Sequence, residues 1–447
     1  MADAGSEPLW SPGPVRRQTA NVRRFIELLR REVDPGIRDY ADLHHFSLQH
    51  PRTFWRAVWD FCHILGAPGL QVVEDFDSFP GARWFPQARL NFAANLLRHR
   101  DDEAALVFRN EAGARSELSH AELCCAVARC ASALRGCGVG PGDRVAGFLP
   151  NLPETVIAML AASSIGAVWS SCSPDFGAKG VLDRFGQIEP VLLIAADGYR
   201  FKGRVIDIRD KVAEVSNGLG SGCSHCLLIP WQKTGELAGA LNWDEVLDND
   251  FDLPGFAQMP FDHPLYILFS SGTTGKPKCI VHGAGGTLLQ HLKEHRLHTD
   301  IRRADRLFYF TTCGWMMWNW LVSGLASGTT LVLYEGSPFH PEPDTLWRMA
   351  DDLGVTVFGT SAKYLSAQQK AGVRVVDRLP LQHLRAVLST GSPLAPESFD
   401  YLQRDIKPGV QICSISGGTD IVSCFALGNP MLPVRRGQLQ CRGLGLA

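Results

Sequence analysis

Short, continuously apolar segments alternate with helical segments from about residue 104 onward, and this alternation constrains the fold most. Strands are expected at 104–108, 145–149, 191–195, 355–358, 384–388 and 410–415, and helices at 119–135, 344–353 and 395–404. A strand that is apolar at every position buries both of its faces, which is typical of parallel sheets covered by helices. We therefore predict an α/β fold with doubly wound parallel sheets.

One helix carries signals for both of its ends. Ser119 is placed as its N-cap, Glu122 stands three residues later as in a capping box, and Gly136 is expected to end it. The local signals therefore agree with the helix that the apolar spacing predicts.

The first 90 residues differ from the rest and are predicted to be a helical N-terminal lead-in. Helical spacing covers 22–29 and 51–65, and aromatic residues such as Trp55 and Trp59 are expected to pack on the main body. Residues 91–447 are predicted to form the second and larger domain.

Composition narrows the class of protein. The chain has 447 residues, is 45% apolar and has a formal net charge of -2, which argues against a nucleic-acid partner bound through bulk charge. No apolar stretch reaches membrane-spanning length, and residues 1–8 lack the pattern of a signal peptide. Thirteen cysteines without such a signal favour reduced thiols in the cytosol.

A loop rich in hydroxyls, glycines and lysines follows an apolar strand at 266–269. It runs from Ser270 to Lys278 as Ser-Ser-Gly-Thr-Thr-Gly-Lys-Pro-Lys. Glycines let backbone N–H groups approach a polyanion, hydroxyls donate hydrogen bonds, and lysines supply charge. The Walker A pattern does not fit, because it needs glycine at Ser270 and a hydroxyl residue at Pro277. The loop nevertheless predicts a phosphate site.

Two more small-residue loops follow predicted strands, at 389–394 and 416–420. In open α/β sheets ligands bind beyond the carboxyl ends of strands. The loop at 416–420 contains Asp420, a carboxylate able to bind Mg²⁺. Three such loops predict a nucleotide crevice.

These loops, in this order, resemble the adenylate-forming (AMP-binding) superfamily and, within it, the short-chain acyl-CoA synthetases. The resemblance extends through Gly166–Gly177, Gly314–Trp320 and Tyr334–Pro338. It implies an acid–thiol ligase with the cofactors ATP, CoA and Mg²⁺. Such an enzyme joins a carboxylate to AMP and then passes the acyl group to CoA.

The resemblance also implies residue roles. Phosphate binding falls to Ser271, Gly272, Thr273, Thr274, Gly275, Lys276 and Lys278, and adenine contact to Gly391, Ser392 and Pro393. Ser416 and Thr419 would also line the nucleotide, with Thr419 at the α-phosphate and Asp420 at Mg²⁺. Thr419, Asp420 and Lys276 are thus the candidate catalytic residues.

The acyl pocket is predicted from the absence of bulky aromatic side chains at two positions. Family members that use acetate carry bulky aromatic residues where Ser416 and Gly417 stand, so space is free for a four-carbon keto acid, acetoacetate. Trp315, Trp318, Gly417 and Gly418 are the expected pocket residues, although the Trp-rich stretch could equally be core. Asn319 or a Trp indole N–H could donate to the keto oxygen. Propionate or butyrate is the alternative substrate.

Three other sequence patterns have a structural interpretation as well as a functional one. Arg200, Lys202 and Arg204 form a basic segment that suits the phosphates of CoA, or else a solvated loop. Cys223–Cys226 is a lone CxxC, and His291–His295 matches an HxxEH string. We interpret these as an ordinary strand start and a solvated helix face, and predict no metal ligands in either.

The chain ends soon after Asp420, before the small C-terminal domain that the family carries. We therefore expect a truncated form that is incomplete at its C-terminal end and poorly active or inactive. A catalytically silent nucleotide-binding or protein-binding fragment is the alternative from a different class.

Overall fold

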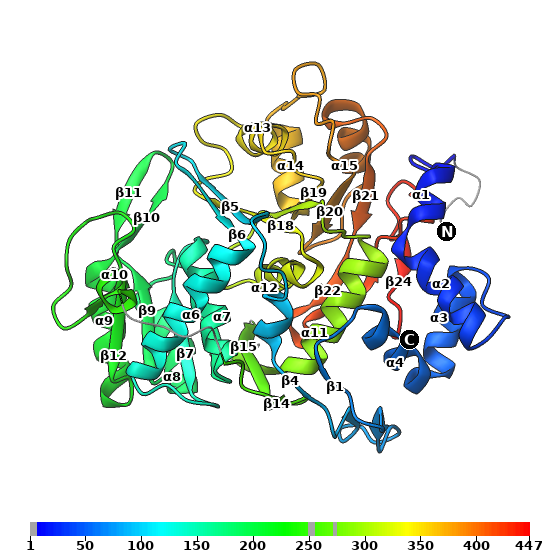
Figure 1. Ribbon diagram of the computed structural model, residues 1–447. Helices are drawn as coiled ribbons and strands as arrows, with labels where there is room; N and C mark the ends of the chain where they lie inside the picture. The colour runs from blue at the N-terminus through cyan, green and yellow to red at the C-terminus, as the bar shows by residue number, and fades with distance from the viewer. Residues whose placement is uncertain (1–6, 249–254, 271–274) are drawn as a thin grey trace.

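The computed structural model describes residues 7–248, 255–270 and 275–447, and two seven-stranded sheets dominate it (Figure 1). The first sheet has the order β13 (Leu241–Asn242), β12 (His225–Ile229), β9 (Leu192–Ala196), β7 (Arg144–Phe148), β8 (Val168–Cys172), β15 (Pro264–Ser270), β16 (Lys278–Gly283). The second has the order β21 (Gln411–Ser414), β20 (Ala386–Thr390), β19 (Val357–Ser361), β17 (Arg306–Tyr309), β18 (Thr330–Glu335), β5 (Ala104–Asn110), β6 (Arg115–Ser119). Neighbouring strands are parallel except at the β15–β16 and β5–β6 edges, which confirms the predicted α/β class.

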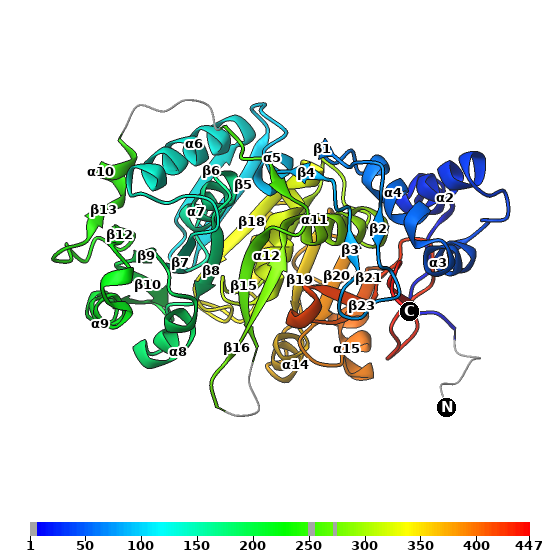
Figure 2. The same ribbon diagram turned by 90° about the horizontal axis from the view of Figure 1, so that it is seen from below.

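Helices form three layers around the two sheets (Figure 2). The inner layer lies between the sheets and contains α5 (Phe92–Leu96), α7 (Pro153–Ser164), α11 (Ala284–Lys293) and α12 (Met316–Ser323), with α6 (His120–Gly136) packed on α7. The outer faces are covered by α8 (Ala178–Ile188) and α9 (Arg209–Leu219) on the first sheet, and by α13 (Thr345–Asp352), α14 (Ala362–Lys370) and α15 (Pro396–Tyr401) on the second.

The layers explain why the strands lack polar alternation. On β17, Leu307 and Tyr309 belong to the central core, whereas Phe308 points to the outer core beside α13. Successive strand residues face opposite sides of a sheet, so a strand buried on both sides is apolar throughout.

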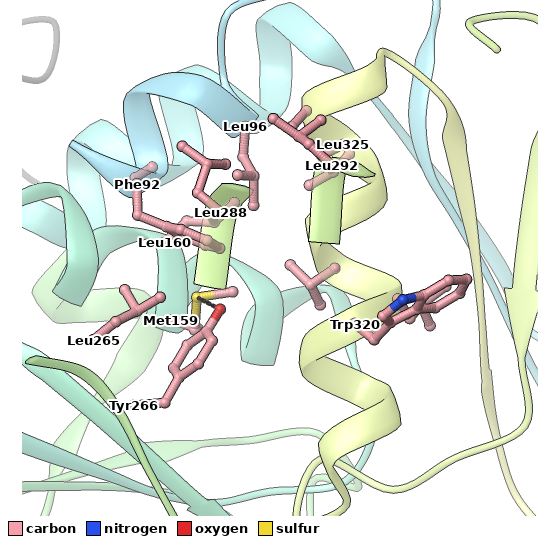
Figure 3. Packing of buried hydrophobic residues seen from close by; sticks show 14 of the residues in the cluster. Phe92, Leu96, Met159, Leu160, Leu265, Tyr266, Leu288, Leu292, Trp320 and Leu325 are labelled. Atoms are coloured by element: carbon pink, nitrogen blue, oxygen red, sulfur yellow. Dashed lines mark hydrogen bonds between the residues drawn. The ribbon is translucent and has the colours of Figure 1, made fainter. Parts of the chain in front are cut away.

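The inner helices join the two sheets through one core, whose centre Figure 3 shows. Leu288 and Leu292 of α11 belong to this core together with Phe92, Met159 and Tyr266, and all five are at most 1% exposed. The relative position of the two sheets therefore depends on this apolar packing.

Local signals fixed some element ends and missed others. The α6 capping box is present, with Glu122 N–H donating to Ser119 Oγ at 3.1 Å and Ser119 N–H donating to Glu122 Oε2 at 2.8 Å. The helix expected at 395–404 ends earlier, because α15 passes into a π-helical turn at Leu402–Ile406. The segment at 416–418, expected as a loop, is a short strand, β22 (Ser416–Gly418), paired with β23 (Ser423–Leu427).

The N-terminal helices α1 (Pro14–Thr19), α2 (Asn21–Glu32), α3 (Tyr40–Gln49) and α4 (Pro51–Phe61) lie beside the last residues of the chain (Figure 1). Gly445 N–H donates to Ser47 Oγ at 2.9 Å, and His44 Nε2 lies 3.1 Å from the Leu446 carbonyl oxygen. Trp59 is 3% exposed and belongs to the central core. Within the described residues, no helix is long and apolar enough to cross a membrane.

Shortening one buried side chain of the inner helix α11 should lower the stability of the whole protein. Leu288→Ala leaves a cavity between the sheets and is expected to lower the free energy of unfolding by about 2–5 kcal/mol. The matched control Leu70→Ala, at a side chain 97% exposed, should change it by less than about 0.5 kcal/mol. Urea denaturation of both variants checks this, and equal stability of the two would contradict the shared core.

Candidate active site

A cavity of about 540 Å³ lies where strands of both sheets end at their carboxyl ends. Pro150 and Asn151 come after β7, Ser173 to Asp175 after β8, Phe310 to Thr312 after β17, Glu335 and Gly336 from the end of β18, and Ser361 from the end of β19. Helix packing between the sheets brings these ends together. The cavity therefore has the location at which α/β sheets bind ligands.

Trp315 lines this cavity and joins it to the predicted adenine loop. It is the N-cap residue of α12, and its ring lies edge-on to Tyr309 with a centroid distance of 6.0 Å. Gly391 has φ +86°, and a Cβ there would lie 3.6 Å from Trp315 Cζ2. Ser392 and Pro393 continue that loop and are exposed. The predicted pocket residue Trp315 and the predicted adenine residue Gly391 therefore lie beside each other at the cavity wall.

Trp318 and Asn319, in contrast, lie behind the cavity wall. Trp318 is fully buried, and its indole N–H donates to Asn151 Oδ1 at 2.9 Å. Asn319 is also fully buried, beside Tyr266 in the central core. Trp318 thus orients Asn151 instead of lining the cavity, and Asn319 is poorly placed to meet a keto oxygen.

The Thr419–Asp420 turn follows β22 as the 3₁₀ segment η5 (Thr419–Ile421), which contacts β15. The Asp420 side chain is exposed, and no hydrogen bond or ion pair to it occurs among the described residues. A single free carboxylate fits Mg²⁺, which uses one or two protein carboxylates together with substrate phosphates and water. No cluster of three possible metal-ligating side chains exists in the described part of the chain.

The phosphate loop connects β15 to β16 in an antiparallel hairpin, in which Ser270 pairs with Lys278. Ser271, Gly272, Thr273 and Thr274 lie outside the described residues. Gly275 has φ +109°, and Lys276 and Lys278 are exposed. Because η5 contacts β15 and His282 of β16 binds the Thr419 carbonyl oxygen, the Thr419–Asp420 turn lies beside the described strands of this hairpin.

The basic segment forms the hairpin β10 (Gly198–Phe201) and β11 (Arg204–Asp207), and Arg200 lines the cavity. The Glu111 carboxylate accepts from the N–H groups of Lys202 at 3.0 Å and Gly203 at 2.7 Å. Glu335 accepts from Arg200 N–H, and burial raises the pKa of Glu335 to about 7. Two carboxylates from the second sheet thus hold this hairpin, and Lys202 and Arg204 remain exposed.

The structure gives a packing reason for the glycine at Gly417, whose place in the acyl pocket stays a prediction. A Cβ at Gly417 would lie 2.3 Å from the Ser423 carbonyl oxygen, so its missing side chain is required by the β22–β23 pairing. Gly418 is open, with no atom nearer than 3.9 Å to an added Cβ. Ser416 is exposed and pairs with Ala426. The absence of bulk at Gly417 follows from strand packing.

The interpretation of His291–His295 as a solvated helix face is wrong. His291, Glu294 and His295 are completely buried, and His291 Nε2 lies 2.7 Å from the Val422 carbonyl oxygen. Burial lowers the pKa of His291 to about 4 and that of His295 to about 3, so both rings are neutral at pH 7. The sequence shows that His291 and His295 are spaced to lie on one face of a helix. It does not show that other segments cover this face.

The chain belongs to the AMP-binding enzyme family, whose model matches residues 92–440. A second model, the acetyl-coenzyme A synthetase N-terminus, matches residues 40–96. Together these matches cover the sheets, the inner helices and helices α3 and α4, and they confirm the superfamily resemblance.

Individual relatives are more specific. The chain is 50% identical to an acetoacetyl-coenzyme A synthetase of Rhizobium meliloti, over 98% of this chain and 68% of the relative. It is 39% identical to a malonamoyl-CoA synthetase of Penicillium aethiopicum, over 99% of this chain and 65% of the relative. The solved acetoacetyl-CoA synthetase of Streptomyces lividans matches with a TM-score of 0.94 and 46% identity, over 98% of this chain and 69% of that one. The predicted absence of a C-terminal domain is not confirmed by these matches and stays a prediction.

The close contact at Gly417 can be tested by adding one methyl group. Gly417→Ala is expected to lower the free energy of unfolding by about 2 kcal/mol, because the methyl group meets backbone atoms that cannot move independently. Gly418→Ala is the matched control, since its φ of -167° is ordinary extended backbone and its surroundings are open. Thermal unfolding of the two variants measures this, and a Gly417→Ala protein as stable as the wild type would contradict the close contact.

Proposed function

We propose that this chain activates acetoacetate with ATP and forms acetoacetyl-CoA. The observation that carries the proposal is 50% identity to an acetoacetyl-coenzyme A synthetase across 98% of the chain. The solved relative with a TM-score of 0.94 has the same activity in its name. The nucleotide-type loops at the carboxyl ends of the strands support the same chemistry independently.

The reaction has two steps. A carboxylate oxygen of acetoacetate attacks the α-phosphorus of ATP, and the bond to pyrophosphate breaks. The CoA thiolate then attacks the acyl carbon of the adenylate, and AMP leaves with the electron pair of the broken C–O bond. Both steps move charge between anions, so positioning and charge neutralisation are the main tasks of the protein.

The nucleotide is assigned to the phosphate loop and the two turns. Lys276 and Lys278 supply positive charge to the β- and γ-phosphates, Gly391 lies beside the adenine, and Thr419 donates to the α-phosphate. Asp420 would hold Mg²⁺, which neutralises phosphate charge when bound. The exposure of Lys276 and Asp420 supports these roles, since both side chains can reach a ligand.

The cavity lined by Trp315 and Arg200 is proposed as the place where the acyl group and the thiol arm of CoA meet. In its lining, Trp315 adjoins Gly391, and Arg200 belongs to the basic hairpin that also carries Lys202 and Arg204. The cations of this hairpin suit the phosphates of CoA. The acyl and CoA predictions thus meet in one cavity.

Recognition of the second carbonyl group is assigned to the Trp315 side of the cavity. Acetoacetyl and malonamoyl groups, named in the two relatives, both carry a carbonyl at the third carbon. The Trp315 indole N–H is the remaining donor from the predicted set, because Trp318 donates to Asn151 and Asn319 is buried in the core. An acid without this oxygen would leave a donor unpaired.

Pyrophosphate exchange into ATP with a panel of acids tests the proposal. We expect acetoacetate to support exchange at least about tenfold better than butyrate, because butyrate lacks the keto oxygen. The Streptomyces lividans relative, assayed in parallel, provides the reference rate. Equal rates with butyrate would favour a general short-chain synthetase, and ATP binding without any exchange would favour a silent nucleotide-binding module.

Two substitutions should separate the charge roles at the phosphates. Lys276→Ala and Asp420→Ala are each expected to slow exchange by roughly 100-fold. Raised Mg²⁺ should partly restore Asp420→Ala, which has lost a metal ligand, but should leave Lys276→Ala unchanged. The rates are measured across a Mg²⁺ titration, and the same Mg²⁺ response in both variants would contradict the assignment.

A further inference from the structure

Three buried polar side chains from one stretch of chain bind the Thr419–Val422 turn and the strand that follows it. His282 Nε2 on β16 lies 2.8 Å from the Thr419 carbonyl oxygen. His291 Nε2 on α11 lies 2.7 Å from the carbonyl oxygen of Val422. The turn is therefore held on both sides of Asp420.

The third side chain, Glu294, binds the strand that follows the turn. Its Oε1 accepts from the Ser423 hydroxyl and from the Cys424 N–H at 3.1 Å, and its Oε2 accepts from the Trp320 indole N–H at 2.9 Å. A completely buried carboxylate is costly unless it is fully hydrogen-bonded, and this one is.

The directions of these bonds follow from their acceptors. A carbonyl oxygen can only accept, so Nε2 of His282 and of His291 must each carry the proton. For His291, Nδ1 is then unprotonated, and it lies 2.7 Å from Ser323 Oγ, whose one proton also has the Asn319 carbonyl oxygen within reach at 2.9 Å. The ring is thus fixed by a contact at each nitrogen.

The turn that they hold is strained. Val422 has φ +47° and ψ +32°, the left-handed conformation that β-branched residues rarely adopt. Such a residue persists only where its surroundings over-determine it, and it occurs most often at functional sites. Val422 is 4% exposed, and its carbonyl oxygen is the one that His291 binds.

The stretch from His282 to Glu294 also contains a buried polar group whose burial costs free energy. Lys293 is completely buried, and its Nζ lies 3.7 Å from Glu294 Oε1, too far for a hydrogen bond. No hydrogen-bond partner of Nζ is found in the described part of the chain. Because a buried ion pair is weak evidence for stability, Lys293 is not counted among the groups that hold the turn.

We propose that His282, His291 and Glu294 are positioning residues that hold the strained Thr419–Val422 turn so that Asp420 faces Mg²⁺ and the nucleotide. β16 begins at Lys278, directly after the phosphate loop, so one continuous stretch connects the loop to the turn. None of the three side chains needs to touch the nucleotide. The proposal rests on the proposed function, because it requires an ATP site at this turn.

The test measures ATP binding by the whole chain, with Mg²⁺ and with EDTA, by isothermal titration calorimetry. The wild-type protein should bind ATP more tightly with Mg²⁺, through Asp420. In His282→Leu this Mg²⁺-dependent gain should fall about tenfold, while binding in EDTA changes less than about twofold. His282→Gln should restore the gain, because its amide N–H can take the place of Nε2–H.

His263→Leu is the matched control, because His263 Nε2 also contacts a backbone carbonyl oxygen, that of Gly166 at 2.7 Å, away from the turn. It should keep the full Mg²⁺-dependent gain. His282→Asn covers the case in which the leucine variant does not fold, since the shorter amide cannot reach Thr419 and should lose the gain that His282→Gln keeps.

The outcomes separate the two proposals. An unchanged Mg²⁺-dependent gain in His282→Leu, or an equal loss in His263→Leu, would overturn the positioning role and leave the ATP site intact. Failure of His282→Gln to exceed His282→Asn would overturn it as well. Absence of ATP binding in the wild-type chain would overturn the proposed function and the positioning role together.

Discussion

The packing of apolar helices between two sheets is the constraint on which the rest of the structure depends. Leu288 and Leu292 of α11 contribute to a core that both sheets share. Because this core fixes one sheet against the other, the carboxyl ends of β7 and β8 face those of β17 and β18 across a single cavity. Neither sheet could form that cavity alone, since each contributes only part of the lining.

Much of the fold was predictable because its signals are local. The capping box of Ser119 and Glu122 and the continuously apolar strands need no knowledge of distant residues. The loop after β20 was predictable for the same reason, and the structure places its Gly391 beside Trp315, whereas 416–418 is a strand. The assignment of Thr419 and Asp420 came from the resemblance, and the structure adds which side chains hold them.

What the sequence could not predict depends on long-range contacts. The HxxEH string has the same pattern whether its face is solvated or buried. His291 and Glu294 are covered because α12 and the segment from Val422 to Cys424 pack against them. Gly417 has a similar explanation, since its lack of a side chain is required by the partner strand. In both cases the local pattern does not show which segment packs on it.

A crystal structure of the chain with AMP and CoA bound tests the central claim most directly, namely that one cavity between the two sheets joins the nucleotide site to the CoA site. The account predicts adenine beside Gly391, the AMP phosphate at Thr419, and the CoA thiol arm passing Trp315 with its phosphates near Arg200. CoA bound outside this cavity, or AMP away from the Thr419 turn, would contradict it.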